Sequence, residues 1–155
     1  MRKALLGLML LVLPGLTAAQ DSNDCRQVGG TISTNFLNST TTFGSATGDL
    51  AGGVGVKILS TTSSPNGVLV FHNQHSWVTA TGDTIFVQPV DATAFPSGVA
   101  GLYATRYLNG VAISGGTGRF QNARGRLSVW GAADTNKQEI VLRYEGKLCF
   151  GQADE

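Results

Sequence analysis

Two cysteines, Cys25 and Cys149, lie near opposite ends of a chain of 155 residues and are its only cysteines. In an exported protein such a pair favours a disulfide, the alternative being two buried free thiols. A disulfide holds the two Cα atoms within about 7 Å, so the first and last strands must be neighbours. Closing a loop of ~100 residues contributes roughly 4.7 kcal/mol in the chain-entropy model. The pair therefore favours a sheet that closes on itself.

The first twenty residues, MRKALLGLMLLVLPGLTAAQ, have the pattern of a secretory signal. Two basic residues precede an apolar run over residues 4–13, which is too short to cross a bilayer of ~30 Å as a helix. Thr17 and Ala19 then supply the small residues of a cleavage site. We expect residues 1–19 to be removed as a signal peptide, rather than kept as a membrane anchor. The mature protein is then expected to be secreted, or periplasmic in the cell envelope, with no membrane segment.

The charge of the expected mature chain, residues 20–155, excludes one class of partner. The whole sequence has 11 Lys and Arg against 10 Asp and Glu, and two of the basic residues lie in the leader, which leaves nine against ten. Nucleic-acid binders normally carry a strong basic excess, so no nucleic-acid partner is expected. The length of the mature chain predicts a single domain.

The mature sequence shows no helical periodicity, and its abundant Gly, Thr, Ser and Val are typical of strands and turns. The clearest strand covers residues 137–149, where Ile140, Leu142, Tyr144 and Leu148 alternate with polar residues. The remaining expected strands lie within residues 27–36, 48–62, 67–80, 84–91, 102–108, 111–114 and 125–131. Full closure removes the exposed edges of such a sheet. The prediction is an all-β fold, a closed antiparallel barrel of about eight strands, in preference to a sandwich.

The segment GGTGRFQNARG, residues 115–125, combines four glycines with two arginines. A phosphate-binding loop would need a Lys after the glycines, and a dinucleotide fingerprint would need a glycine in place of Gln121 and a helix afterwards. A tight turn explains more, because glycine tolerates φ > 0 and Phe120 can be buried beneath the turn. The expected structural turn comprises Gly115, Gly116, Thr117, Gly118, Phe120 and Gly125.

Residues 113–131, ISGGTGRFQNARGRLSVWG, resemble the GGTGxFxxAxG segment of the allene oxide cyclase/dirigent-like barrels, including their bacterial relatives. The resemblance implies an eight-stranded antiparallel barrel, often a homotrimer, whose lumen holds a small hydrophobic molecule and needs no cofactor. It further implies guidance of a cyclisation or of a radical coupling. The matching residues form a turn, so no catalytic residue is transferred to this sequence.

The segment FHNQHSWVT, residues 71–79, is the richest in chemistry. Alternation places Phe71, Asn73, His75 and Trp77 on one face, which fits a lumen wall that lines a small-ligand site. His75 would serve there as a general acid or base near neutral pH. The alternative is that Phe71 and Trp77 are core residues and His75 is a hydrogen-bonded spacer. His72 lies on the opposite face from His75, so no metal site is expected.

Two further lumen candidates, Arg106 and Tyr107, are adjacent in the expected strand 102–108, so their side chains point to opposite faces. An arginine inside the barrel would bind a carboxylate or an oxyanion. On the outer face it would be a solvated charge. The predicted ligand-binding set is therefore Phe71, His75, Trp77, Arg106 and Tyr107.

Three functions are compatible with these observations. The first is an exported barrel that binds a small hydrophobic or aromatic molecule in its lumen and guides a cofactor-free cyclisation or isomerisation. The second is a non-catalytic barrel, filled by its own side chains, that acts through its outer surface or by oligomerising. The third is a hydrolase whose triad assembles only in space, although no G-x-S-x-G nucleophile motif is present.

Overall fold

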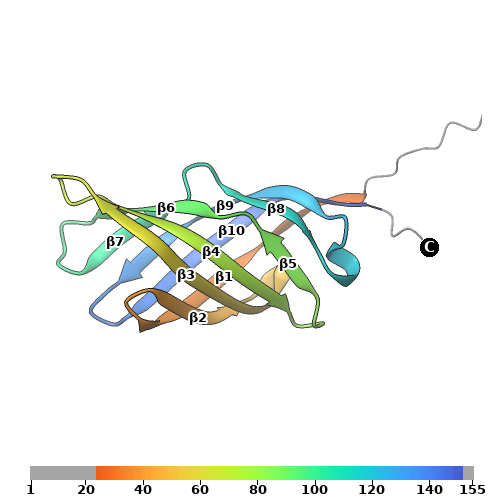
Figure 1. Cartoon of the computed structure of the whole chain (residues 1–155), viewed down its shortest axis with the longest axis horizontal. Helices are drawn as coiled ribbons and strands as arrows, with labels where there is room; N and C mark the ends of the chain where they lie inside the picture. The colour runs from red at the N-terminus through yellow and green to blue at the C-terminus, as the bar shows by residue number, and fades with distance from the viewer. Residues whose placement is uncertain (1–23, 152–155) are drawn as a thin grey trace, which may run out of the picture.

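The computed structural model describes residues 24–151, and within them the fold is all β with two short 3-10 turns (Figure 1). The predicted signal peptide and its cleavage site lie outside the described residues. The elements are β1 Asp24–Asn38, β2 Thr41–Ala46, η1 Gly48–Leu50, β3 Gly52–Ser63, β4 Leu69–Thr79, β5 Thr84–Val87, β6 Val90–Pro96, β7 Leu102–Arg106, β8 Val111–Gly116, η2 Gly118–Phe120, β9 Arg124–Asp134 and β10 Glu139–Phe150. No helix among these residues is long and apolar enough to cross a membrane.

These ten strands form a closed antiparallel barrel with eight strand positions around its circumference, each of which is called a stave below. β5 and β6 pair with opposite ends of β4, and β7 and β8 pair with different parts of β9. β5 and β6 therefore form one interrupted stave, and β7 and β8 form the next. These two staves pair with each other through β5 with β8 and β6 with β7. β10 pairs with both β1 and β9 and so closes the cylinder. The predicted closed barrel of about eight strands is confirmed.

The structure corrects three strand predictions. The single strand expected over 84–91 is broken at Pro89, because proline has no N–H to donate to a ladder. The strand expected over 102–108 ends at Arg106. The chain then turns at Asn109 and Gly110, and Gly110 has a φ of 63°. The strand Thr41–Ala46 was not predicted, since its mixture of Thr, Phe, Gly, Ser and Ala gives a weak apolar alternation.

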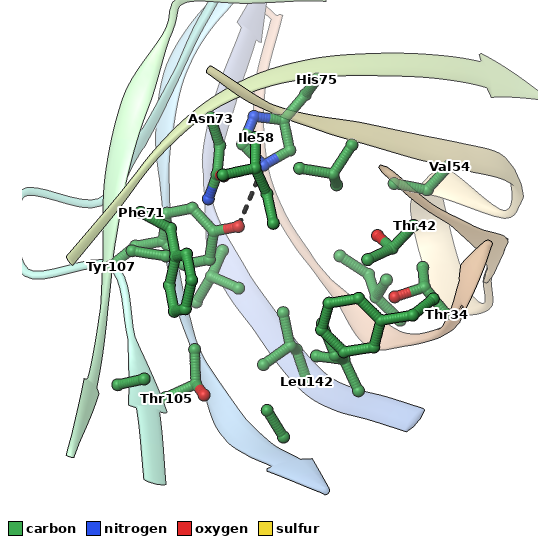
Figure 2. Close-up of a pocket in the computed structure, with 18 of the residues that line it drawn as sticks. Thr34, Thr42, Val54, Ile58, Phe71, Asn73, His75, Thr105, Tyr107 and Leu142 are labelled. Atoms are coloured by element: carbon green, nitrogen blue, oxygen red, sulfur yellow. Dashed lines mark hydrogen bonds between the residues drawn. The ribbon is translucent and has the colours of Figure 1, made fainter. Parts of the chain in front are cut away.

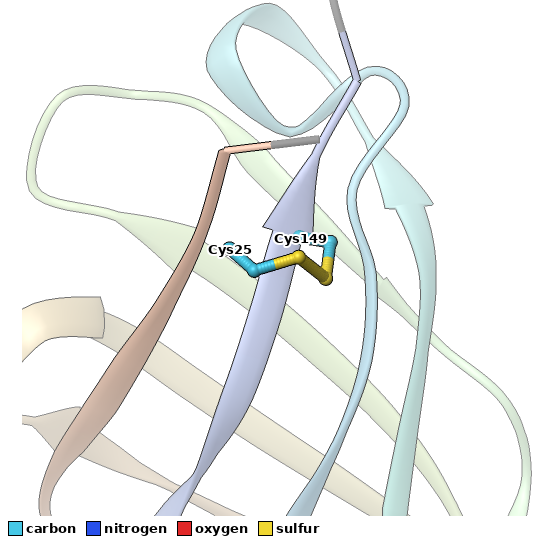
Figure 3. The surroundings of a disulfide bond; sticks show 2 residues. All are labelled: Cys25 and Cys149. Carbon is cyan, nitrogen blue, oxygen red and sulfur yellow. A yellow bond between two sulfur atoms is a disulfide. The ribbon is translucent and has the colours of Figure 1, made fainter. Parts of the chain in front are cut away.

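The disulfide joins the strands that close the barrel (Figure 3). Cys25 on β1 lies directly opposite Cys149 on β10, with a Cα–Cα distance of 3.8 Å and an S–S bond of 2.02 Å. The β1–β10 ladder continues from this point to the pair Asn35 and Glu139. The predicted pairing of the two cysteines is therefore confirmed, and the covalent bond lies at one end of the longest seam.

The barrel end that carries the disulfide is filled by side chains and by the two 3-10 turns, at the right in Figure 1. Leu50 in η1 is 1% exposed and Phe120 in η2 is 0% exposed. The Trp77 indole donates a hydrogen bond to the Leu50 carbonyl at 2.9 Å. The Tyr144 hydroxyl accepts from the Leu50 N–H at 2.9 Å and donates to the Thr47 carbonyl at 2.7 Å. Side chains from β4 and β10 thus hold η1 across this end.

The glycine-rich segment forms the turn between β8 and β9. The backbone of Thr117 donates to the Thr84 carbonyl at 2.9 Å, and the Thr84 N–H donates to the Thr117 hydroxyl at 2.8 Å. A Cβ on Gly116 would lie 2.2 Å from the Thr84 carbonyl oxygen, and Gly118 has a φ of 51°. Arg124 donates hydrogen bonds to two backbone carbonyls near the turn. The backbone geometry explains why glycine occupies these positions.

Replacing both cysteines by serine should lower the free energy of unfolding by about 4 kcal/mol, because the unfolded chain is no longer restrained over a loop of 124 residues. Urea unfolding of the variant measures the loss, and wild-type protein unfolded in the presence of a reductant should match it. Equal unfolding midpoints for oxidised wild type and variant would contradict a stabilising role for the bridge.

The Phe120→Ala variant should unfold at lower denaturant, with a loss of about 3–5 kcal/mol, because it leaves a cavity beneath the turn. Phe86→Ala is the matched control, since Phe86 is 50% exposed on the outer wall and should cost less than about 1 kcal/mol. Similar losses in the two variants would mean that Phe120 does not fill the barrel end as described.

Candidate functional site

The other end of the barrel, at the left in Figure 1, opens into a cavity of about 90 Å³ inside the lumen. Every stave of the barrel contributes to its wall. Apolar atoms make up nearly all of the wall, and none of the lining residues is Lys, Arg, Asp or Glu. Half-buried apolar residues lie toward the open end, among them Phe36, Leu69, Phe71 and Ile140. The cavity therefore suits an uncharged, largely apolar molecule.

The face of β4 expected to line the lumen does so. Phe71, Asn73, His75 and Trp77 all contribute to the cavity wall, and Tyr107 approaches them from the turn after β7. Figure 2 shows Phe71, Asn73, His75 and Tyr107 gathered on one side of the cavity. Alternation along β4 sets these positions, because residues two apart point to the same side of a strand. Whether these residues bind a ligand remains a prediction.

Arg106 does not line the lumen, which corrects its place among the lumen candidates. Thr105 and Tyr107 on either side of it are 8% and 7% exposed and point inward. Arg106 is therefore on the outer face, where its guanidinium is hydrated. This is the second of the two orientations that the sequence allowed.

A polar network joins three lumen residues. His75 Nε2 and the Tyr107 hydroxyl are 3.0 Å apart, drawn as the dashed line in Figure 2, and the two rings have centroids 5.6 Å apart. The Asn73 side chain also hydrogen-bonds to the Tyr107 hydroxyl. If the Asn73 amide donates to Tyr107, the tyrosine hydrogen is directed to His75 Nε2, and the imidazole proton resides on Nδ1.

Burial keeps both ionisable members of this network neutral. It lowers the pKa of His75 from 6.5 to about 4. Burial also raises the pKa of Tyr107 from 10.0 to about 12, outweighing the opposite effect of the Asn73 hydrogen bond. At neutral pH the cavity therefore offers a neutral imidazole, a phenol and an amide, with no formal charge.

Four buried polar atoms of the lumen wall have no hydrogen-bond partner among the described residues. They are Thr42 Oγ1, Asn73 Oδ1, His75 Nδ1 and Thr105 Oγ1. Each such atom costs about 1–3 kcal/mol when it is left unpaired, and native proteins contain few of them. Their concentration around one cavity means that the wall has hydrogen-bonding capacity that the protein itself does not use.

The threonines in this set, together with Thr34, were missed by the sequence analysis. A single threonine within a strand gives no signal of its own, because threonine is common on either face of a sheet. Only the register of β2 and β7 relative to their neighbours places Thr42 and Thr105 inside.

The outer face of β4 carries His72, whose Nδ1 lies within hydrogen-bond distance, 2.7 Å, of the Asp91 carboxylate on β6. His72 and His75 therefore lie on opposite sides of the barrel wall. Within residues 24–151 there is no group of three or more His, Cys, Asp and Glu residues that could hold a metal ion.

No protein-family model matches the chain. No curated protein matches it closely enough to count as a relative. Among solved structures, it is similar to the pterocarpan synthase dirigent protein GePTS1, with 14% sequence identity, 93% of this chain and 98% of that chain covered, and a TM-score of 0.36.

Protonation of His75 should destabilise the fold in acid. Its pKa is about 4 when folded and 6.5 when unfolded, so the unfolded state binds more protons between these values and stability falls as the pH drops from 6.5 to 4. The full loss is about 3 kcal/mol. Urea unfolding from pH 7.5 to 4 measures it, with His75→Gln expected to have a flatter profile than wild type.

Ser76→Ala is the control for this experiment, because Ser76 lies exposed on the outer face of the same strand and carries no ionisable group. Its profile should follow that of the wild type. Identical pH profiles for wild type and His75→Gln would contradict a buried neutral imidazole at position 75.

Proposed function

We propose that this protein is an exported barrel that binds a small, uncharged, mostly apolar molecule in its lumen. The observation that carries the proposal is a wall without a charged side chain in which buried polar atoms lack protein partners. Ligand pockets commonly combine an apolar lining with a few polar groups that fix orientation. Export is supported by the disulfide, which is characteristic of oxidising compartments, and by the signal-like sequence of residues 1–19.

Asn73, His75 and Tyr107 are the groups that would orient the ligand. Asn73 Oδ1 can accept a hydrogen bond, and His75 Nδ1 can donate one in the tautomer set by Tyr107. A cavity of about 90 Å³ is smaller than the roughly 300–1,000 Å³ of sites for drug-sized molecules. The favoured ligand is therefore compact, on the scale of one substituted ring, and carries a hydroxyl or carbonyl group.

The same network argues for orientation rather than acid–base catalysis by the protein. Moving the Tyr107 proton to His75 would join a donor of pKa about 12 to an acceptor of pKa about 4. That mismatch corresponds to on the order of 10 kcal/mol. Proton transfer from Tyr107 to His75 is thus unfavourable, and we propose that any cofactor-free cyclisation or isomerisation in this lumen is guided by hydrogen bonds and by the shape of the wall.

A non-catalytic barrel is the second candidate, and the modest volume of the cavity favours it. In this case the lumen is core, and the protein acts through its outer surface or as an oligomer, which the family resemblance implies to be a trimer. Native mass spectrometry of protein purified from the envelope of its own host distinguishes the two. A co-purified small molecule supports the lumen site, and its repeated absence supports the second candidate.

The lumen site should prefer a hydroxylated ring to the same ring without the hydroxyl. We expect 4-methylphenol to bind more tightly than toluene. Asn73→Leu or Tyr107→Phe should reduce the ratio of these two affinities about 5- to 10-fold, because this is the effect on affinity of losing one hydrogen bond. NMR titration measures both affinities.

Phe86→Ser is the control for this titration, because it alters an exposed residue of the outer wall and should leave binding unchanged. Failure of both probes to bind the wild type, equal binding of the two probes by the wild type, or an unchanged preference in Asn73→Leu and Tyr107→Phe would overturn the proposed orienting groups.

A further inference from the structure

Basic side chains gather on one part of the outer wall. Residues 41–87 contain a single Lys or Arg, Lys57. In contrast, β7, β9 and β10 carry the exposed residues Arg106, Arg126, Arg143 and Lys147. Together β7, β9 and β10 carry five Lys or Arg residues against three Asp or Glu residues. This side of the barrel therefore has a net positive charge, and the strands β2 to β5 carry few charged residues.

At the centre of the charged side, Trp130 of β9 lies between two arginines. It is directly opposite Arg106 of β7 across one ladder and Arg143 of β10 across the other. Side chains at directly opposed positions point to the same face and start about 4.5–5.5 Å apart. A half-buried indole on the outer wall is thus flanked on both sides by guanidinium groups.

An open groove of about 790 Å³ runs along this region. The turn after β7, which projects from the wall at the top of Figure 1, forms one rim through Leu108 and Asn109. The Asn109 carbonyl accepts a hydrogen bond from Arg126 and so fixes this rim to β9. Arg106 and Trp130 lie along the groove, and Leu108 is 62% exposed within it.

The positive charge in the groove is not neutralised by the protein. Within residues 24–151, none of Arg106, Arg126 and Arg143 forms an ion pair with a carboxylate. Glu145 is the acidic residue of the groove lining, and it too lies outside ion-pair distance of a basic group. The groove therefore has an excess of positive charge beside an apolar ring surface.

We propose that this groove is a second binding site, for a ligand that has a ring with an apolar face and a carboxylate. The ring would pack on the Trp130 indole, whose face offers a large rigid apolar surface. The carboxylate would accept hydrogen bonds from Arg106, whose planar guanidinium matches its geometry, with Arg143 adding charge from the other side. Uronate units of acidic polysaccharides and aromatic acids both carry this combination.

This site is independent of the lumen proposal. The groove lies on the outer wall, and the lumen has no Lys or Arg that could compensate a carboxylate, while burial keeps His75 neutral. Binding of the acid therefore tests the groove alone, and binding of 4-methylphenol tests the lumen alone.

The test titrates the full protein with a galacturonate oligomer and with 2-naphthoate, each beside its uncharged methyl ester. We expect at least one acid to bind, at least tenfold more tightly than its ester and more weakly as salt rises from 20 to about 300 mM, because charges at an open surface are screened. The acid that binds identifies the source as sugar or aromatic. Binding of neither acid, or equal affinity for acid and ester, overturns the proposal.

Variants locate the site. Arg106→Gln and Trp130→Leu should each weaken binding of the acid about tenfold or more, because one removes the charge-assisted hydrogen bonds and the other the ring surface. Lys57→Gln is the matched control, since it removes an exposed positive charge from the side of the barrel formed by β2 to β5. An unchanged disulfide and circular dichroism spectrum verify folding. Retained affinity in Arg106→Gln, or an equal loss in Lys57→Gln, overturns the assignment.

Discussion

Closure of the sheet between β1 and β10 is the constraint on which the rest of the structure depends. The ladder runs from Asp24 and Phe150 to Asn35 and Glu139, with the disulfide near its beginning. Once the seam is closed, every strand has an inner and an outer side, and alternation along it assigns each residue to one of them. Opening the seam would leave two exposed strand edges and no lumen.

The two ends of the cylinder are built differently, and this difference creates the cavity. At the disulfide end, Leu50 and Phe120 fill the interior, and Trp77 and Tyr144 hold η1 across it by hydrogen bonds. Toward the other end the inward residues combine half-buried apolar side chains such as Phe71 with polar ones such as Thr105 and Asn73. The closed end gives the barrel its stability, while the open end leaves unpaired polar atoms beside empty volume.

The barrel wall also separates a charged side chain from an uncharged one that is adjacent to it in the sequence. Arg106 and Tyr107 are consecutive, yet one contributes charge to an outer groove and the other a neutral phenol to the lumen. Water screens and solvates the arginine, whereas burial raises the pKa of the tyrosine to about 12. A thin sheet can therefore present a cationic surface on one side and an uncharged cavity on the other.

Much of the fold was predictable from local signals. The cysteine positions indicated the seam, the alternation within residues 137–149 indicated β10, and the glycines of residues 115–125 indicated a turn. The grouping of Phe71, Asn73, His75 and Trp77 on one face of β4 followed from a period of two, and the residue types on that face favoured the lumen side. Pattern alone failed for β2, where the alternation is weak, and for Arg106, since a strand period assigns two faces without saying which is inside.

The sequence by itself determined the all-β class, most of the strands, the likeness of the turn to a known barrel segment and the residues that alternate along each strand. Tertiary structure decided which face of each strand was the lumen, that Thr42 and Thr105 join Asn73 and His75 around one cavity, and that Trp130 lies between Arg106 and Arg143. The physical reason is that these neighbours are distant in the chain. Only the register of the closed ladders brings them together, because register depends on contacts summed over the whole barrel.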